Sequence, residues 1–166
     1  MNAQAEDHHL LFVTGLLALI IAIVIVFFPP RLAGGMGVAV SYSVLDQGPI
    51  SGVSSRVNYL ITDQAGFKNL WQMLHGASST PPTVDFSQNE VIALFAGAEP
   101  TAGYEIGIAS ISATAAHRLV SVDIGMPAAG CASTSVETTP YELAVLPASS
   151  LPLSHEDVAV AAPCGN

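Results

Sequence analysis

Basic side chains are scarce in this chain. Four Lys and Arg stand against thirteen Asp and Glu among 166 residues, so the net charge at pH 7 is −9. From Gly37 onward only Arg56, Lys68 and Arg118 are basic, against eleven acidic residues. Such a surface repels phosphate groups, which excludes nucleic-acid binding and disfavours docking onto anionic lipid. Two explanations of the charge stay open: it serves solubility or a salty habitat, or it recognises a basic partner.

Catalytic motifs are also missing. The sequence has no HExxH, CxxC, EF-hand or G-x-S-x-G pattern and no Gly-rich phosphate loop before a helix. Histidines are few, and nothing local supports a thiol–imidazole pair of Cys131 with His117. We therefore predict that the protein is not an enzyme and has no catalytic residue, no cofactor and no small-molecule substrate.

Two short runs of metal-ligand residue types are weak candidates. Residues 6–9 read Glu-Asp-His-His, but adjacent ligands rarely converge on one ion without a second segment. In His155-Glu156-Asp157 the first and third side chains share one side if the chain is extended. We predict no metal site.

One long apolar run lies near the N-terminus. Residues 10–28 carry no charge, and a helix over them spans roughly 28 Å, close to the hydrocarbon thickness of a bilayer. A cleaved signal peptide has a basic start and a shorter core, whereas residues 1–9 hold Glu6 and Asp7 and no Lys or Arg. Because Ala33-Gly34-Gly35 resembles a cleavage site, the signal peptide stays an alternative to the single-pass anchor that we predict.

Two features disagree about the side of the membrane. Arg31, the basic residue nearest the run, places the following domain in the cytoplasm by the positive-inside rule. Cys131 and Cys164 are the only cysteines; if paired, they close a loop of about 32 residues, worth about 3–4 kcal/mol, and such a bond persists only in an oxidising compartment. Two unpaired thiols are the alternative. We predict the disulfide, and a periplasmic or extracellular domain on the cell membrane.

Small residues mark one face of the apolar run. Gly15, Ala18 and Ala22 are spaced three and four apart, with Thr14 beside them. Lipid gives no hydrophobic drive for helix association, so close packing at small residues must supply it. We predict that this face contacts another transmembrane helix; a featureless anchor is the alternative.

Residues 29–37 predict a linker, because Pro29-Pro30 stops a helix and three glycines follow. Residues 38–166 predict one compact domain, α+β but mainly β: an antiparallel β-sandwich-like fold with one packed helix. Alternating or continuous apolar residues predict strands near 38–44, 57–61, 91–96, 104–108, 120–124 and 141–145. Ile111 falls out of phase and predicts a bulge.

An apolar stripe predicts the single helix: Phe67, Leu70, Trp71 and Leu74. Thr62 is the expected N-cap, and Gly76 follows the last turn. The tail after Ser149 is rich in Pro, Ser and Ala, and we expect it to lie loosely over the surface unless Cys164 ties it down.

Five short motifs follow one another between residues 55 and 150. They are Val84-Asp85-Phe86, an apolar strand 91–97 ending in Gly, Pro100-Thr101-Ala102-Gly103-Tyr104, Met126 to Gly130, and Pro140-Tyr141 followed by 142–146. This stretch resembles the C-terminal domain of the PrcB-like family, which is named for a non-catalytic subunit that associates with and stabilises a secreted protease. The resemblance implies an accessory subunit that acts by protein–protein contact. Members are often secreted or lipid-anchored, whereas this chain has no cysteine near its start to lipidate.

The loop Glu99, Pro100, Thr101, Ala102, Gly103, Tyr104 is also similar to the binding loop of chagasin-type cysteine-protease inhibitors. Those inhibitors are immunoglobulin-like β-sandwiches with an N-P-T-T-G-Y loop and a second R-P-W loop. Here Glu99 replaces the Asn, Ala102 replaces the second Thr, and Thr139-Pro140-Tyr141 is the nearest match to the second loop.

Our prediction is therefore a short tail (1–9), a transmembrane helix (10–28), a linker (29–37) and a PrcB-like β-rich domain (38–166). The function predicted is a non-catalytic, membrane-anchored accessory subunit that binds and stabilises a membrane protein complex, one that can include a protease. The alternative is a chagasin-like inhibitor. Partner-binding residues are predicted at Gly15, Ala18 and Ala22 on the helix and at Glu99, Pro100, Thr101, Gly103 and Tyr104 on the loop. A tight turn with no binding role is the alternative for the loop.

Overall fold

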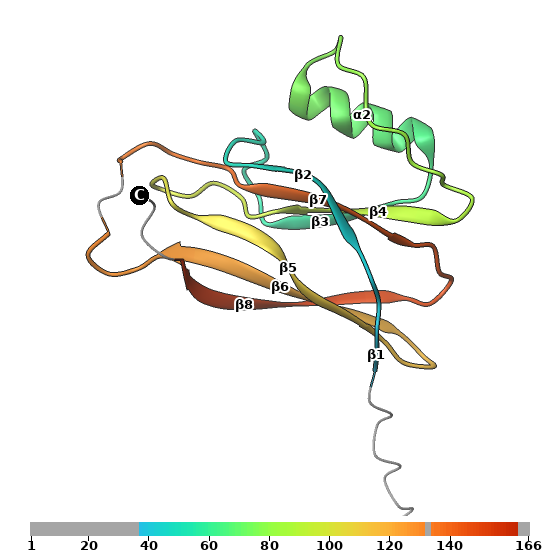
Figure 1. Ribbon diagram of the computed structural model, residues 1–166. Helices are drawn as coiled ribbons and strands as arrows, with labels where there is room; N and C mark the ends of the chain where they lie inside the picture. Colours follow the sequence, from blue (N-terminus) through green and yellow to red (C-terminus); the bar gives the residue numbers. More distant parts are fainter. Residues whose placement is uncertain (1–36, 132–133, 163–166) are drawn as a thin grey trace, which may run out of the picture. The chain divides into compact units, whose positions relative to one another are not determined.

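The computed structural model describes residues 37–131 and 134–162. This part of the chain folds into a β-sandwich with a helix packed on one outer face, so three layers lie on one another (Figure 1). The elements follow the chain as β1 (Val38–Ala39), β2 (Ser43–Gly48), β3 (Val57–Ile61), α2 (Gln64–His75), β4 (Asn89–Phe95), β5 (Glu105–Ala113), β6 (Arg118–Pro127), β7 (Tyr141–Pro147) and β8 (Leu153–Ala162). The mainly β fold with one helix confirms the predicted class.

The sheet under the helix has the order β2-β7-β4-β3 and is antiparallel throughout. Its central strands, β4 and β7, are buried along almost their whole length. One set of alternate residues faces the helix and the other set faces the second sheet, which explains why both strands read as continuous apolar runs rather than alternating ones.

The second sheet has the order β1-β5-β6-β8. β5 and β6 form an antiparallel hairpin whose register shifts between Ile108 and Ser110, which confirms the predicted bulge. β8 pairs parallel to β6, from Arg118 opposite Leu153 to Pro127 opposite Ala162. The antiparallel prediction is therefore wrong for this pair, and the expectation of a loose tail after Ser149 is wrong because ten of its residues form β8.

The sandwich has two apolar cores, one on each side of the β2-β7-β4-β3 sheet. The core between the sheets contains Ile92, Leu94, Ala96, Ile106, Ile108, Ile111, Val120, Val122, Ala144 and Leu146. The core under the helix contains Phe67, Val84, Val91, Ala93, Phe95, Tyr141 and Leu143, with Leu70, Trp71 and Leu74 packed against it. The predicted helix stripe is confirmed. Phe67 is its fully buried member, and Trp71 is half-buried with its ring 5.9 Å from that of Phe67.

The helix begins one residue later than predicted. Asp63, not Thr62, is the N-cap: its Oδ1 accepts hydrogen bonds from the N–H groups of Ala65 at 2.9 Å and Gly66 at 2.8 Å. An aspartate is the stronger cap here because its charge also favours the positive helix start. The helix ends at His75, and Gly76 follows with φ +91°, as the sequence predicts.

Five predictions fall on residues outside the described ones: the tail at 1–9 with its Glu-Asp-His-His run, the anchor at 10–28, the linker up to 36, the Gly15–Ala18–Ala22 face, and Cys164. Within residues 37–131 and 134–162, no helix is long and apolar enough to span a membrane.

Candidate functional site: the loop end of the sandwich

Three loops meet at one end of the sandwich, and we call this region the loop end. They are residues 49–56 between β2 and β3, residues 96–104 between β4 and β5, and residues 128–140 between β6 and β7, of which 132–133 are not described. The predicted binding loop is the second of the three. These loops connect β2 to β3, β4 to β5 and β6 to β7, so the position of the loop end depends on six strands from both sheets.

Thr138 joins the second and third loops. Its N–H and C=O exchange two backbone hydrogen bonds with Glu99, at 3.0 and 2.8 Å, as in a short antiparallel ladder. The Thr138 hydroxyl also donates to the carbonyl of Thr101 at 3.1 Å, and the Ala102 N–H donates to the carbonyl of Thr134 at 3.1 Å. The predicted loop is therefore held along its length and is not a free turn.

Thr139 joins the first and third loops. Its N–H donates to the carbonyl of Pro49 at 2.8 Å, and its hydroxyl oxygen accepts from the N–H groups of Ser51 at 2.8 Å and Gly52 at 3.0 Å. Thr138, Thr139 and Ser51 are all buried, so the hydrogen bond from the Ser51 N–H to the Thr139 hydroxyl oxygen is shielded from water. The two threonines thus fix three loops into one platform.

Two glycines allow the second loop to take this path. Gly97 and Gly103 have φ of +94° and +92°, a region that side chains with a Cβ rarely adopt. A Cβ on Gly97 would stand 3.0 Å from the backbone nitrogen of Arg56, and one on Gly103 would stand 3.2 Å from Cγ of Pro127. The sequence-based expectation of a glycine with positive φ in the Pro100–Tyr104 loop is confirmed at Gly103.

The predicted loop residues differ in exposure. Pro100 and Gly103 are exposed, whereas Glu99, Thr101 and Tyr104 are half-buried. Burial raises the pKa of the Glu99 carboxyl, because desolvation disfavours its charged form. Tyr104 and Gly103 line a groove of about 440 Å³. Its other lining residues are Gln47, Gly48, Pro49, Glu105, Ile106, Pro140 and Tyr141.

Large apolar side chains project from the platform. Ile50 is 58% exposed and Val136 is 57% exposed, and each lies in a loop that the threonines hold. Single exposed apolar residues are common, but these two project from loops that are hydrogen-bonded to each other, and exposed apolar side chains on such loops are candidates for a protein contact. Ile50, Val136 and Thr138 were not predicted from the sequence, and Thr139 was predicted only as part of the second inhibitor-like loop. The adjacent Thr138-Thr139 before Pro140-Tyr141 is the sequence signal for the platform.

The second loop of the inhibitor resemblance is not available for contact. Thr139, Pro140 and Tyr141 are buried, and Tyr141 is already the first residue of β7. The Tyr141 hydroxyl donates to Asp46 Oδ2 at 2.8 Å, and its pKa is raised by burial and by this carboxylate. These residues therefore support the platform from inside.

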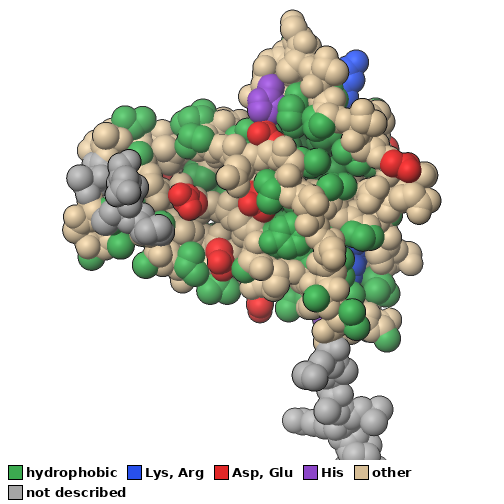
Figure 2. Space-filling view, in the orientation of Figure 1, with side chains coloured by type: hydrophobic (Ala, Val, Ile, Leu, Met, Phe, Trp, Pro, Cys, Tyr) green, Lys and Arg blue, Asp and Glu red, His purple; other side chains and the backbone are tan. Residues whose placement is uncertain are grey.

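The charge of the domain is spread over its surface. In the view of Figure 2, acidic side chains are scattered over the visible face, and the few visible Lys and Arg atoms lie on the side away from the loop end. At the loop end, Glu99, Glu105 and Glu137 lie in or next to the loops. Arg56, at the end of the first loop, is neutralised by an ion pair with Asp157 at 2.6 Å. The platform thus combines apolar side chains with a negative surround.

The weak metal candidate on β8 takes the geometry expected of an extended chain. His155 Nε2 and Asp157 Oδ1 lie 4.0 Å apart on one side of the strand. Within the described part of the chain, no group of three or more His, Cys, Asp or Glu side chains is placed to hold a metal ion. Asp157 is instead the partner of Arg56.

Of the two cysteines in the predicted disulfide, the structure describes Cys131 and not Cys164. Cys131 follows β6, and its N–H donates to the carbonyl of Ala128 at 3.0 Å. Cys164 lies two residues beyond Ala162, the last residue of β8. The parallel register aligns Pro127 with Ala162, so β6 and β8 end side by side. The pairing of the two cysteines stays a prediction.

Comparison with known proteins gives one match. The family described as PrcB C-terminal matches residues 91–147, which confirms the predicted resemblance over this segment. No curated protein and no solved structure matches the chain.

The matched segment holds β4, β5, β6 and β7, the central strands of both sheets, together with two of the three loops of the loop end. The Val84-Asp85-Phe86 motif lies just before it. Val84 and Phe86 pack in the core under the helix, while Asp85 Oδ1 accepts from the Ser87 N–H at 3.0 Å and from the Ser87 hydroxyl at 2.6 Å. The hydrogen bonds to Ser87 lower the pKa of Asp85.

Proposed function

We propose that this protein is a non-catalytic accessory subunit, anchored in the membrane by residues 10–28, that binds and stabilises a protein partner through the loop end. One observation carries the proposal: Thr138 and Thr139 tie three loops into a buried hydrogen-bonded platform that presents Ile50 and Val136 to solvent. A rigid platform loses little conformational entropy on binding, so apolar contacts made on it are retained as affinity. The PrcB C-terminal match is consistent with a protease complex as the partner.

The surround of the platform favours a partner with basic residues. Glu99, Glu105 and Glu137 lie in or next to the loops of the loop end, and the net charge of the whole chain is −9. Opposite charges around an apolar centre mainly raise the association rate and exclude wrong partners. We therefore expect binding to weaken with salt while the apolar contacts persist.

The inhibitor function is the weaker candidate because its second loop is buried. A chagasin-type contact needs two exposed loops side by side. Of the two inhibitor-like loops, 99–104 has exposed residues, whereas Thr139-Pro140-Tyr141 is buried. Addition of the full-length chain to a papain-type cysteine protease distinguishes the two functions: inhibition at stoichiometric concentration would support the alternative, and unchanged protease activity is expected.

Co-purification from native membranes in mild detergent tests the accessory function. We expect the tagged full-length chain to bring a defined partner, and the double variant Ile50→Lys/Val136→Lys to lose it. Met73→Lys is the matched control, because Met73 is 53% exposed on α2, on another part of the domain. A wild-type chain that purifies alone, or a double variant that retains its partner at wild-type yield, would refute binding through the loop end.

A second double variant tests the predicted transmembrane contact. Gly15→Leu with Ala18→Leu keeps the run hydrophobic but fills its small-residue face. We expect a reduced yield of the partner if that face packs against another helix. A wild-type yield would leave residues 10–28 as a tether and all recognition in the β domain.

A further inference from the structure

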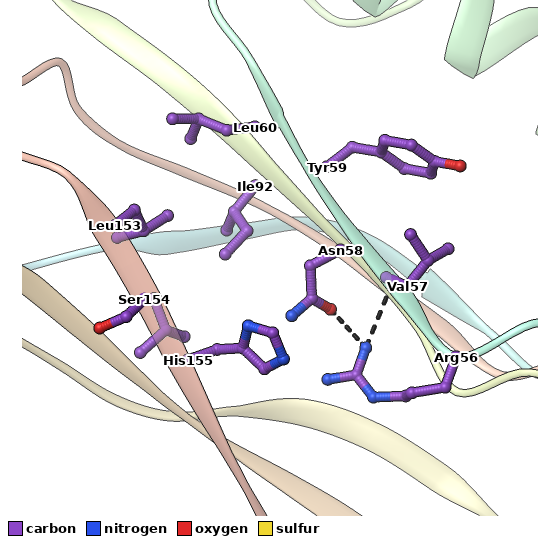
Figure 3. Close-up of a pocket in the computed structure, with 10 residues that line it drawn as sticks. Arg56, Val57, Asn58, Tyr59, Leu60, Ile92, Leu153, Ser154 and His155 are labelled. Carbon is purple, nitrogen blue, oxygen red and sulfur yellow. Dashed lines mark hydrogen bonds between the residues drawn. The ribbon is translucent and has the colours of Figure 1, made fainter.

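A cleft opens between the two sheets along the edge that β3 and β8 form, away from the loop end contacts of Thr138 and Thr139 (Figure 3). Its volume is about 450 Å³. Consecutive residues of both edges line it, residues 56–60 on one side and 153–155 on the other, with Ile92 and Val120 completing the lining. Because consecutive residues line the cleft, the strand backbones themselves form its walls.

β3 is the edge strand of its sheet, so within the described residues one side of its backbone has no strand partner. Tyr59 is 50% exposed and Leu60 is 42% exposed. Neighbouring residues of a strand point to opposite faces of the sheet. The Tyr59 ring lies 5.9 Å from that of Phe95, on the helix side, whereas Leu60 lines the cleft on the other side (Figure 3).

Because the exposed Tyr59 and Leu60 side chains lie on opposite faces of the sheet, they limit the kind of ligand that can cover both. A small ligand seated in the cleft would cover the Leu60 side chain and leave the Tyr59 ring, which lies on the helix side, exposed. A ligand on the helix side would do the reverse. A strand added alongside β3 covers both side chains at once and also pairs the open side of the backbone.

A polar side chain in the cleft, Asn58, also favours an added strand. Asn58 Oδ1 accepts a hydrogen bond from Arg56 Nη1, while the Asn58 amide nitrogen is buried and has no hydrogen-bond partner within the described residues. Figure 3 shows this nitrogen on the side of the amide that faces Ile92 and His155. An acceptor side chain at the neighbouring position of an added strand would satisfy it. On the added strand, the residue beside Asn58 and the residue beside Leu60 are two positions apart, so their side chains point to the same face.

The opposite wall is protected against the same kind of pairing. His155 and Asp157 of β8 lie opposite the buried Val120 and Val122 of β6 and so point to the inner face, and an inward acidic residue such as Asp157 is a common way in which edge strands avoid pairing. Asp157 also binds the Arg56 guanidinium at two points, Nε to Oδ2 at 2.9 Å and Nη2 to Oδ1 at 2.6 Å, and so bridges the two edges. The available edge is therefore β3.

We infer that β3 is a second recognition site, which binds an extended, uncharged segment of a partner protein as an added strand. The segment places an aliphatic side chain over the cleft beside Leu60, a hydrogen-bond acceptor two positions away beside Asn58, and a large apolar residue between them beside Tyr59. The site shares no residue with the exposed apolar side chains of the loop end, so either site can exist without the other.

Selection of peptides on the full-length chain tests this site directly. The probe is a phage-displayed library of random 12-residue peptides, selected in parallel on the wild-type chain and on Tyr59→Lys/Leu60→Lys. We expect enrichment of uncharged sequences in which apolar residues and an acceptor follow the pattern above, and at least roughly tenfold weaker binding of them to the double variant. No enrichment on the wild-type chain, or peptides that bind both chains equally, would overturn the inference.

The backbone pairing is tested with one enriched peptide as a synthetic probe. A copy with alternate N-methylated residues cannot donate the hydrogen bonds of one strand edge, so it should bind at least roughly tenfold more weakly if an added strand forms. Amide exchange of Asn58 and Leu60 should slow on binding of the unmethylated peptide. Equal affinities of the two peptides would show that the segment binds without joining the sheet.

Three further variants keep the outcomes distinct. Val44→Lys, at a 48% exposed position on the opposite edge strand of the same sheet, should bind the peptide as the wild type does. If the double variant does not fold, Leu60→Ser replaces it. Ile50→Lys/Val136→Lys should retain peptide binding, because it alters only the loop end. Concentration-dependent dimers that Leu60→Ser abolishes would assign β3 to a second copy of the chain and overturn the inference.

Discussion

Arg118 on β6 and Glu90 on β4 form an ion pair inside the sandwich, with side chains only 2% and 3% exposed. The guanidinium also donates to the carbonyls of Leu151 at 3.1 Å and Ser149 at 3.4 Å. The pair therefore joins the two sheets and fixes the chain that leads into β8. A buried charge is costly without its partner, so the two residues depend on each other.

Removal of one partner should be strongly destabilising. Arg118→Met leaves the Glu90 carboxylate buried without a cation, and we expect the free energy of unfolding to fall by about 3–5 kcal/mol. The double variant Arg118→Met/Glu90→Leu removes both charges and should regain much of that loss. Urea unfolding of the three chains measures this. Additive losses in the double variant would show that the two residues are not coupled.

Glu142 predicts an unusual pH dependence of stability. It is buried in β7, and its Oε1 accepts from the Ile108 N–H at 2.9 Å. Burial raises its pKa above the ordinary value of 4.5, although the hydrogen bond from Ile108 partly opposes this. The folded state therefore holds the proton more tightly than the unfolded chain. The resulting stability is present below pH 4.5 and is lost as pH rises through the raised folded pKa.

Glu142→Gln removes this titration while its amide oxygen can still accept from Ile108. We expect the variant to be more stable than the wild type at pH 7 and the difference to shrink towards pH 4, measured by urea unfolding across that range. Glu137→Gln, at an exposed position, is the control and should follow the wild type. A Glu142→Gln curve parallel to the wild-type curve at every pH would contradict the raised pKa.

The helix depends on Phe67 more than on Trp71. Phe67 is 0% exposed and contacts the rings of both Trp71 and Phe86 at 5.9 Å. Phe67→Ala should lower the free energy of unfolding by about 3–5 kcal/mol. Trp71→Ala should cost less, because its ring is half-buried and rests on His75 at 4.3 Å. Met73→Ala should change stability by less than about 0.5 kcal/mol. Thermal unfolding that ranks Trp71 above Phe67 would refute this order.

The disulfide between Cys131 and Cys164 remains a prediction with a direct test. Intact mass spectrometry under non-reducing conditions should show a mass two hydrogens lower than that of the reduced chain. Reduction should lower stability by about 3–4 kcal/mol, because the bond closes a loop of about 32 residues. Two thiols that alkylate after unfolding without a reductant would exclude the bond and favour a cytoplasmic domain.

Local patterns in the sequence predict the elements whose burial is local. The stripe at Phe67, Leu70, Trp71 and Leu74 defines the helix, and the apolar run at 91–96 defines the central strand β4. The out-of-phase Ile111 reveals the bulge in β5. In each case the residues that carry the signal are those that the core requires, so sequence and structure agree.

Non-local pairing explains the failures. β8 is an edge strand with mostly exposed residues, and its charged His-Glu-Asp run hides any alternation; it forms because β6 offers a parallel edge. The alternation from Val38 to Val44 reads as one strand, yet the chain crosses from one sheet to the other between β1 and β2. At the loop end, the turn chemistry of Gly103 is visible in the sequence, but the pairing of Glu99 with Thr138 is not, because 39 residues separate them.

The pairing of β2 with β7 sets the order in which this domain can be made. Ser43 lies opposite Val145 and Gly48 opposite Tyr141, so residues about a hundred positions apart must meet before β2 has a neighbour. Such long-range contacts slow folding, because closing the loop costs entropy before any contact compensates for it. β7 also supplies a central strand of one sheet, and β8 completes the other. A growing chain therefore has neither sheet complete until residues 141–162 have left the ribosome, so the sandwich can form only after almost the whole domain has been synthesised.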